Sequence, residues 1–179
     1  DNGDADDLSN VVANRNVYAT YTPVYKEYKV EFVDEDGSSI NSKADYHYGD
    51  RVALPTNPTK QATAEYTYTF AGWSENGTDI IDLSNATVEK NVTYTAVYTS
   101  VKNQYTVTFY DEDKTTVLGT STVDYGTNAT YPNGTPTKAD TNTYTYTFNK
   151  WVDALDVEDN LSNVTANRDV YATYTETYK

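Results

Sequence analysis

Few side chains in this 179-residue sequence are of the types that catalyse reactions. His47 is the only histidine, and Asp124 takes the corresponding position in a later, similar stretch of the chain. General-base and metal sites that use histidine need partner groups around it, so we expect His47 to be a surface position. With no cysteine in the sequence, disulfides, thiolate nucleophiles and cysteine-ligated zinc are excluded.

Two runs of three acidic residues are the clearest candidates for a cation site. They are Asp34, Glu35 and Asp36, repeated at 111–113. Calcium takes about six to eight oxygen ligands, whereas consecutive carboxylates alternate in direction along a strand and no EF-hand spacing follows them. We therefore expect solvated turns. Calcium binding is the alternative for both runs and for the acid-rich residues 1–7.

A lysine buried beside a carboxyl group could form an isopeptide cross-link with asparagine. Strand alternation places Lys150 on the side of Tyr146 and Phe148, so it is the one lysine to consider, but Gly72 replaces it in the first copy. We expect no cross-link. Because no set of nucleophile, base and orienting group occurs in either copy, we predict a protein that is not an enzyme, with no catalytic residue, cofactor or metal site.

The composition favours a folded, acidic β protein. Aromatic residues make up 14% of the sequence, 19 of them tyrosine, and the formal net charge is -14. Tyr, Thr and Val suit a pleated surface, and the aromatic content is too high for a disordered chain. A negative chain repels phosphate backbones and anionic membranes, so we expect neither nucleic acid as a partner nor insertion into a membrane.

Internal repetition determines the domain organisation. Residues 8–21 and 161–174 are identical at 12 of 14 positions, and Trp73 and Trp151 lie 78 residues apart. Such self-similarity is the signature of a repeat protein. We predict repeat 1 at 27–102 and repeat 2 at 103–179, with 1–26 as the closing part of a preceding repeat and linkers as short as residues 99–103.

Alternating hydrophobic and polar residues predict the strands of each repeat, and no long helix is indicated. The first strand of each repeat has three apolar positions on one face, and a later strand runs into a tryptophan. A change of side at Gly72 indicates a bulge. The expected strands begin at 27 and 104, approach 48–49 and 125–126, cover 66–73 and 144–151, and close at 92–98 and 170–174, with a further closing strand at 17–21.

The order of these motifs resembles the Listeria–Bacteroides, or internalin B-type, repeat. Its elements are an aromatic strand, a Tyr-Gly pair, a Pro-Thr-Lys segment (58–60), a strand ending in tryptophan and a final Ala-x-Tyr (96–98). The resulting fold-signature residues are Tyr28, Val30, Phe32, Tyr48, Gly49, Tyr68, Phe70, Gly72, Trp73, Tyr105, Val107, Phe109, Tyr125, Gly126, Tyr146, Phe148 and Trp151. The resemblance implies a mostly β fold of tandem β-grasp-like (ubiquitin-like) repeats with mixed or antiparallel sheets and little or no helix. It also implies an extracellular place on the surface of a Gram-positive-type bacterium, wall-anchored through other regions, and no shared enzymatic activity.

Two functional hypotheses fit this sequence. The first is a stalk whose neighbouring repeats hold an adhesive region away from the cell. The second is an adhesion module that binds a host protein or glycan through its strand edges and Tyr/Thr faces; divergence between the repeats on one face would favour it. In addition, the closing strand within 8–21 is expected to pair with a sheet edge of its own chain or of another molecule.

Overall fold

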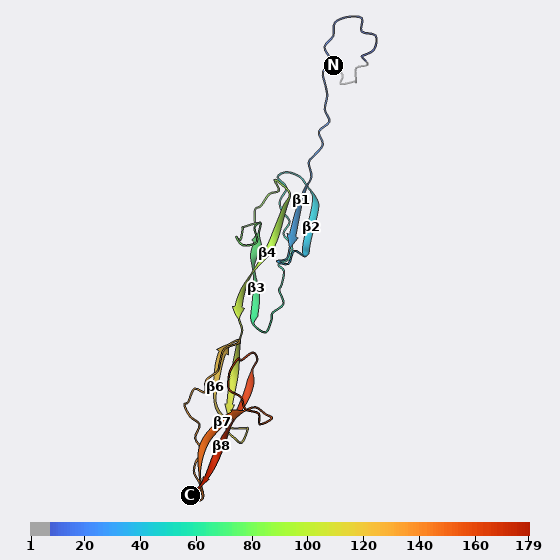
Figure 1. The fold of residues 1–179 in the computed structure, drawn as a ribbon. Helices are drawn as coiled ribbons and strands as arrows, with labels where there is room; N and C mark the ends of the chain where they lie inside the picture. The colour runs from blue at the N-terminus through green and yellow to red at the C-terminus, as the bar shows by residue number, and fades with distance from the viewer. Residues whose placement is uncertain (1–7) are drawn as a thin grey trace.

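The structure, a computed structural model, describes residues 8–179. Two four-stranded sheets lie end to end along an elongated molecule (Figure 1). The elements among the described residues are all β-strands, and none of this part of the chain forms a helix able to span a membrane. The predicted mostly β fold with tandem mixed sheets is confirmed.

Repeat 1 forms the sheet with strand order β2-β1-β4-β3. Its strands are β1 (Tyr28–Val33), β2 (Ser39–Tyr46), β3 (Tyr66–Ser74) and β4 (Val92–Lys102). The central pair, β1 and β4, is parallel, and both edge strands pair antiparallel with it. A parallel pair needs a long crossover, and here the chain between β1 and β4 passes through both edge strands, β2 and β3.

Repeat 2 forms the same sheet with strand order β6-β5-β8-β7. Its strands are β5 (Gln104–Tyr110), β6 (Val117–Asp124), β7 (Tyr144–Val152) and β8 (Arg168–Tyr178). The central strands β5 and β8 are again parallel. The first and last strands of each repeat are therefore neighbours, although more than fifty residues separate them in the sequence.

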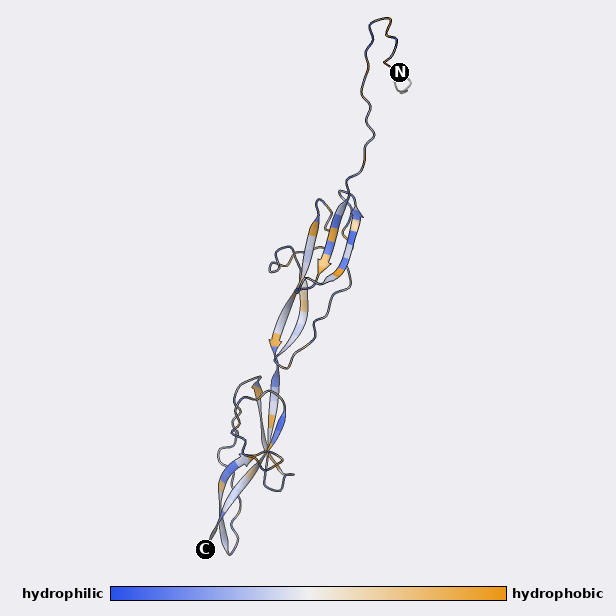
Figure 2. Ribbon diagram, turned by 45° about the vertical axis from the view of Figure 1, so that its right-hand side comes forward, coloured by the Kyte–Doolittle hydropathy of each residue, from blue (hydrophilic) through white to orange (hydrophobic). Residues whose placement is uncertain are grey.

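Each core lies between one face of the sheet and the loops that cover it. In repeat 1 the strands contribute Val30 and Phe32, which are 1% and 2% exposed, and the loops contribute Val52 and Val88. On β1, hydrophobic positions alternate with hydrophilic ones (Figure 2), because successive side chains point to opposite faces. Burial of one face is thus sufficient to fix the register of each strand.

A β-bulge interrupts the strand before each tryptophan. Phe70 pairs with Tyr98 and Gly72 pairs with Val97, so one residue of β3 is left over. The same shift occurs in β7 between Phe148 and Lys150. The bulge predicted at Gly72 is confirmed, and its recurrence at Lys150 shows that glycine is not required for it.

The segment before repeat 1 departs from the prediction. A closing strand was expected at 17–21, but residues 8–27 form no strand and extend away from the first sheet (Figure 1). Val17 and Tyr21 are exposed there. In repeat 2 the matching segment is ordered as β8 by pairing with β5 and β7, and no described strand lies beside 17–21 to satisfy its backbone groups.

Candidate functional surfaces

The buried tryptophan of each repeat is the centre of an aromatic cluster of signature residues. The ring of Trp73 lies 4.8 Å from that of Phe32 and 5.2 Å from that of Phe70. In repeat 2 the ring of Trp151 lies 4.8 Å from Phe109 and 5.3 Å from Phe148. Such edge-to-face pairs stabilise a core beyond the area they bury. These positions serve the fold and present no chemistry to a ligand.

The signature tyrosines at the ends of the strands are less buried. Val30 and Val107 are fully buried, and the half-buried signature positions outside the cluster are Tyr28, Tyr68, Gly72, Tyr105, Tyr125 and Tyr146. Tyr48 is the exception at 69% exposed. The glycines after Tyr48 and Tyr125 have positive φ values of 87° and 79°, and their N–H groups donate to Val88 and Val164. The Tyr-Gly pair thus marks a left-handed turn that glycine favours.

A lysine clamp recurs in both repeats. The Nζ of Lys60 lies 4.1 Å from the ring centre of Tyr68 and 5.8 Å from that of Tyr98, and it forms an ion pair with Glu35. The ammonium group is held by two rings and one carboxylate, an arrangement that combines cation–π and charge attraction. The clamp fastens the loop between β2 and β3 to strands β3 and β4.

Repeat 2 forms the same clamp from the equivalent residues. The Nζ of Lys138 lies 4.0 Å from the ring of Tyr146 and 5.9 Å from that of Tyr174, and it pairs with Glu112. The hydrogen bond to the glutamate raises the pKa of each lysine, so its amine stays protonated and has no lone pair for attack. The sequence analysis marked Lys60 only as part of the Pro-Thr-Lys motif and predicted no contact for either lysine. Recurrence of this motif before a tyrosine-rich strand was the available signal.

A tyrosine–aspartate bond lies next to each clamp. The hydroxyl of Tyr98 donates to Asp34 at 2.9 Å, and that of Tyr174 donates to Asp111 at 3.0 Å. Burial, followed by the bond to the carboxylate, raises the pKa of Tyr98 to about 12. The same causes raise the pKa of Tyr174. Both hydroxyls are held protonated as donors and link the end of the first strand to the last strand.

The acidic runs form turns in which the carboxylates bond to their own backbone. Asp36 accepts from the N–H of Ser38 at 2.8 Å, and bonds to Ser38 lower its pKa. Asp113 accepts from Thr116, which lowers its pKa to about 2. Within residues 8–179 no three Asp, Glu, His or Cys side chains are gathered as a metal site. The acid-rich residues 1–7 lie outside the described part of the chain.

The two other candidate side chains lie at the surface. His47 is exposed and its ring nitrogen lies 3.8 Å from Asp50. Lys150 was expected to face the core by parity, and this was wrong. The bulge shifts its direction, so its side chain is 43% exposed and bonds Glu158 at 3.3 Å.

The joint between the repeats consists of one residue. β4 ends at Lys102 and β5 begins at Gln104, so only Asn103 separates them, which is shorter than the predicted 99–103. The Asn103 side chain donates to the carbonyls of Thr63 and Ala64 at 2.8 and 3.0 Å. It also accepts from the Thr67 hydroxyl at 2.8 Å. The linker side chain is thus fixed to repeat 1.

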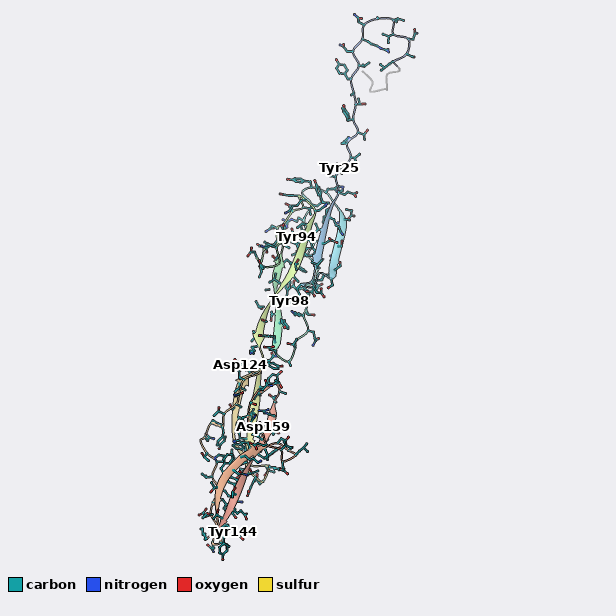
Figure 3. All side chains as sticks on the ribbon, in the orientation of Figure 1. Tyr25, Tyr94, Tyr98, Asp124, Tyr144 and Asp159 are labelled. Atoms are coloured by element: carbon teal, nitrogen blue, oxygen red, sulfur yellow. The ribbon has the colours of Figure 1, made fainter. Side chains whose placement is uncertain are left out.

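The Asn103 backbone and Tyr105 complete the joint. The N–H of Asn103 donates to Glu65 of repeat 1, while its carbonyl accepts from Tyr125 of repeat 2, both at 2.8 Å. The Tyr105 hydroxyl crosses back to donate to Ala64 at 2.7 Å. Figure 3 places Asp124 at the end of repeat 2 that faces repeat 1. Asn103, the one residue of the linker, is therefore hydrogen-bonded to both repeats.

Comparison with known proteins identifies the family of the two repeats. Residues 28–97 and 105–173 each match the Listeria-Bacteroides repeat domain. A solved structure of streptococcal High Identity Repeats in Tandem (SHIRT) domains 3–4 from a cell surface protein is 17% identical, with 85% of this chain and 99% of that chain covered and a TM-score of 0.39. Among curated proteins no match is found. Since two matches in tandem span most of the sequence, the chain belongs to the Listeria–Bacteroides repeat family.

Proposed function

We propose that this chain is a non-catalytic tandem-repeat region of a bacterial cell-surface protein and acts as a stalk that presents an adhesive region. The observation that carries the proposal is the joint at Asn103. A one-residue linker bonded to both repeats restricts bending, whereas longer polar linkers behave as flexible coils. Such units, stacked end to end, extend a structure in proportion to their number.

The remaining features support the same proposal. The sequence carries a net charge of -14, of which repeats 27–102 (12 acidic and 6 basic residues) and 103–179 (11 acidic and 5 basic residues) contribute -6 each, so a long array would stay soluble. The central parallel pair flanked by antiparallel strands also supports assigning each unit to a β-grasp-like fold that lacks the helix. Extracellular placement and wall anchoring through other regions are part of this proposal.

Distance measurements across the joint test the stalk. Cysteines in place of Asn41 in β2 and Thr120 in β6, both exposed, carry spin labels, and no native cysteine competes. We expect a narrow distance distribution. Asn103→Ala, which keeps the linker length but removes the side-chain bonds, should broaden it, and a Gly-Ser insertion after Asn103 should broaden it further. A broad distribution in the unmodified joint would contradict a stiff stalk.

The adhesion role is a second proposal, favoured by one difference between the repeats. On the outer face of repeat 2, Tyr110 and Tyr171 stack with ring centres 5.4 Å apart, and Lys114 lies 5.3 Å from the second ring. The corresponding pair in repeat 1 is Val33 and Thr95. If this face binds a host glycan or protein, binding on an array should be lost in Tyr110→Val/Tyr171→Thr, whereas no binding by the native chain opposes the role.

Strand addition through residues 8–21 is also retained as a proposal. This segment is 12/14 identical to 161–174, which includes the start of β8, and its exposed Val17 matches the fully buried Val170. Residues 17–21 of this segment form no strand and lie beside no strand of the described chain, so this stretch could pair with a sheet edge. Deletion of residues 1–22 should then change the oligomeric state or the stability, and an unchanged protein would end the proposal.

A further inference from the structure

We propose that each repeat is a load-bearing unit. Tension along the array would slide its two central parallel strands past one another, and the contacts between these strands resist that motion. This inference rests on the proposed stalk for its biological setting. Its physical basis is the path of the chain through the sheet. A stalk that tethers an adhesive region would transmit pulling forces, so resistance to tension is a function separate from stiffness.

The chain enters and leaves each repeat at opposite ends. β1 begins at the end of repeat 1 that faces the leading segment, and β4 ends at the joint with repeat 2 (Figure 1). These two strands are direct parallel neighbours, paired from Val30 with Val92 to Val33 with Thr95. Tension on the chain therefore pulls β1 and β4 in opposite directions along their own length.

This direction of loading matters because hydrogen bonds between strands lie across the strand axis. When two parallel strands are pulled past one another, all ladder bonds and the side chains packed beneath them must yield together. When a hairpin is opened from its end, the bonds break one after another. The same set of contacts thus resists the first motion much more strongly than the second.

Side-chain bonds close both ends of this central ladder. At one end, Asn91, which precedes β4, accepts from the backbone N–H of Lys29 at 2.8 Å. At the other end, the Tyr98 hydroxyl of β4 donates to Asp34, which follows β1, at 2.9 Å. The ladder between them contributes four residue pairs, so two latches are a substantial addition.

Both latches recur in repeat 2. Asn167 accepts from the backbone N–H of Thr106 at 2.8 Å, and Tyr174 donates to Asp111 at 3.0 Å. The central pairing recurs as well, from Val107 with Arg168 to Tyr110 with Tyr171. Recurrence matters because an array fails under load at its weakest unit, so a latch in one repeat alone would add little.

Single-molecule pulling on repeat 1 along two axes tests the proposal. Handles on Glu27→Cys and Val101→Cys slide β1 against β4, whereas handles on Glu27→Cys and His47→Cys open the β1–β2 hairpin, since Tyr28 pairs with Tyr46. All three positions are exposed, and the native chain has no cysteine. We expect the first axis to require the higher unfolding force. Equal or lower force along it, in variants of equal melting temperature, overturns the proposal.

The latch provides an internal control. Under constant force on the sliding axis, Asn91→Ala should shorten the folded lifetime by about fivefold, as expected for one lost hydrogen bond. It should have little effect on the opening axis, and Asn57→Ala in the loop between β2 and β3 should leave both lifetimes unchanged. Equal shortening on both axes would mean a general loss of stability and would contradict the latch. A flexible joint at Asn103 would contradict the proposed stalk, but it would not change the unfolding forces or lifetimes measured on repeat 1 alone.

Discussion

Repeat 1 and repeat 2 build the same sheet and aromatic cluster but complete their cores from different elements. In repeat 1, β4 supplies Tyr94, whose ring centre lies 5.3 Å from that of Phe32. The corresponding residue of β8 is Val170, and the ring comes instead from Tyr131 in the loop after β6. That ring lies 5.1 Å from both Phe109 and Trp151.

The exchange is reciprocal. The position of Tyr131 in repeat 1 is Leu54, which is 49% exposed, so the loop there contributes little where the strand already supplies a ring. A core requires a given volume at near-crystalline density, but the element that provides it is free to vary. The two repeats therefore show which contacts the fold demands and which are interchangeable.

The shared aromatic cluster should show the largest effect. Phe32→Ala removes a ring that packs on Trp73 and Tyr94, and should lower the free energy of unfolding of repeat 1 by about 3–5 kcal/mol. Each repeat has its own tryptophan, so fluorescence of Trp151 in a Trp73→Phe background reports repeat 2 alone. Repeat 2 should stay folded, and simultaneous loss of both repeats would show that they share one folding unit.

The interchangeable part of the core is tested by giving repeat 1 the residues that repeat 2 has at the two positions. Tyr94→Val alone should destabilise repeat 1 by about 2–3 kcal/mol, because it leaves a cavity beside Phe32. Adding Leu54→Tyr should recover about 1 kcal/mol or more by supplying the ring as repeat 2 does. Denaturant titration of the four members of this cycle measures the coupling. A coupling of zero would show that the two loops do not place their side chains alike.

The bulge offers a sharper contrast between the repeats. Gly72 has a φ of 153°, and an added Cβ would lie 2.5 Å from Ile80 Cγ2, so Gly72→Ala should cost about 2 kcal/mol. Lys150 occupies the same corner without a positive φ, so Lys150→Ala should change stability by less than about 1 kcal/mol. Equal costs, measured by thermal melting of each variant, would show that the two corners share one backbone geometry.

Much of the strand pattern could be predicted from the sequence. Alternation placed Val30, Phe32, Val107 and Phe109 on a buried face because a pleated strand has a period of two. The order of the motifs indicated the repeat family, and the two matches to the family model confirm it. The prediction of a closing strand at 17–21 was wrong, because it rested on alternation alone and no neighbouring strand in the described part of the chain is present to pair with this segment. Alternation describes the faces of a strand and says nothing about what pairs with it.

The lysine clamp and the latch were not predicted, for a related reason. The clamp joins Lys60 to Tyr98, and the latch joins Lys29 to Asn91, so both depend on segments that are brought together only by the sheet order. The parallel central pair that creates this order is a non-local contact. The prediction for Lys150 failed for a local reason. Strand alternation was assumed to continue past Phe148, but the bulge there reverses the side of the sheet on which Lys150 lies.

A small effect is expected when either tyrosine–aspartate bond is removed. Tyr98→Phe should destabilise repeat 1 by about 1 kcal/mol, and Tyr174→Phe should do the same in repeat 2, since each loses one hydrogen bond to a partly exposed carboxylate. Phenylalanine retains the ring contacts, including the cation–π contact with the clamp lysine. The difference between each variant and the native repeat therefore isolates the hydroxyl group.

The pH dependence reports the state of the Tyr98 hydroxyl, whose pKa is raised first by burial and then by the bond to Asp34. Below pH 10 the Tyr98 hydroxyl is protonated in both folded and unfolded chains, and its contribution is complete. Because its folded pKa is about 12, the unfolded chain releases the proton first, so stability should fall as the pH rises from about 10 to about 12. Trp73 fluorescence in a Trp151→Phe background follows repeat 1, and Tyr98→Phe should remove part of this fall. An identical pH profile in the variant would contradict the raised pKa of Tyr98, because it would show that neither burial nor Asp34 retains the proton in the folded repeat.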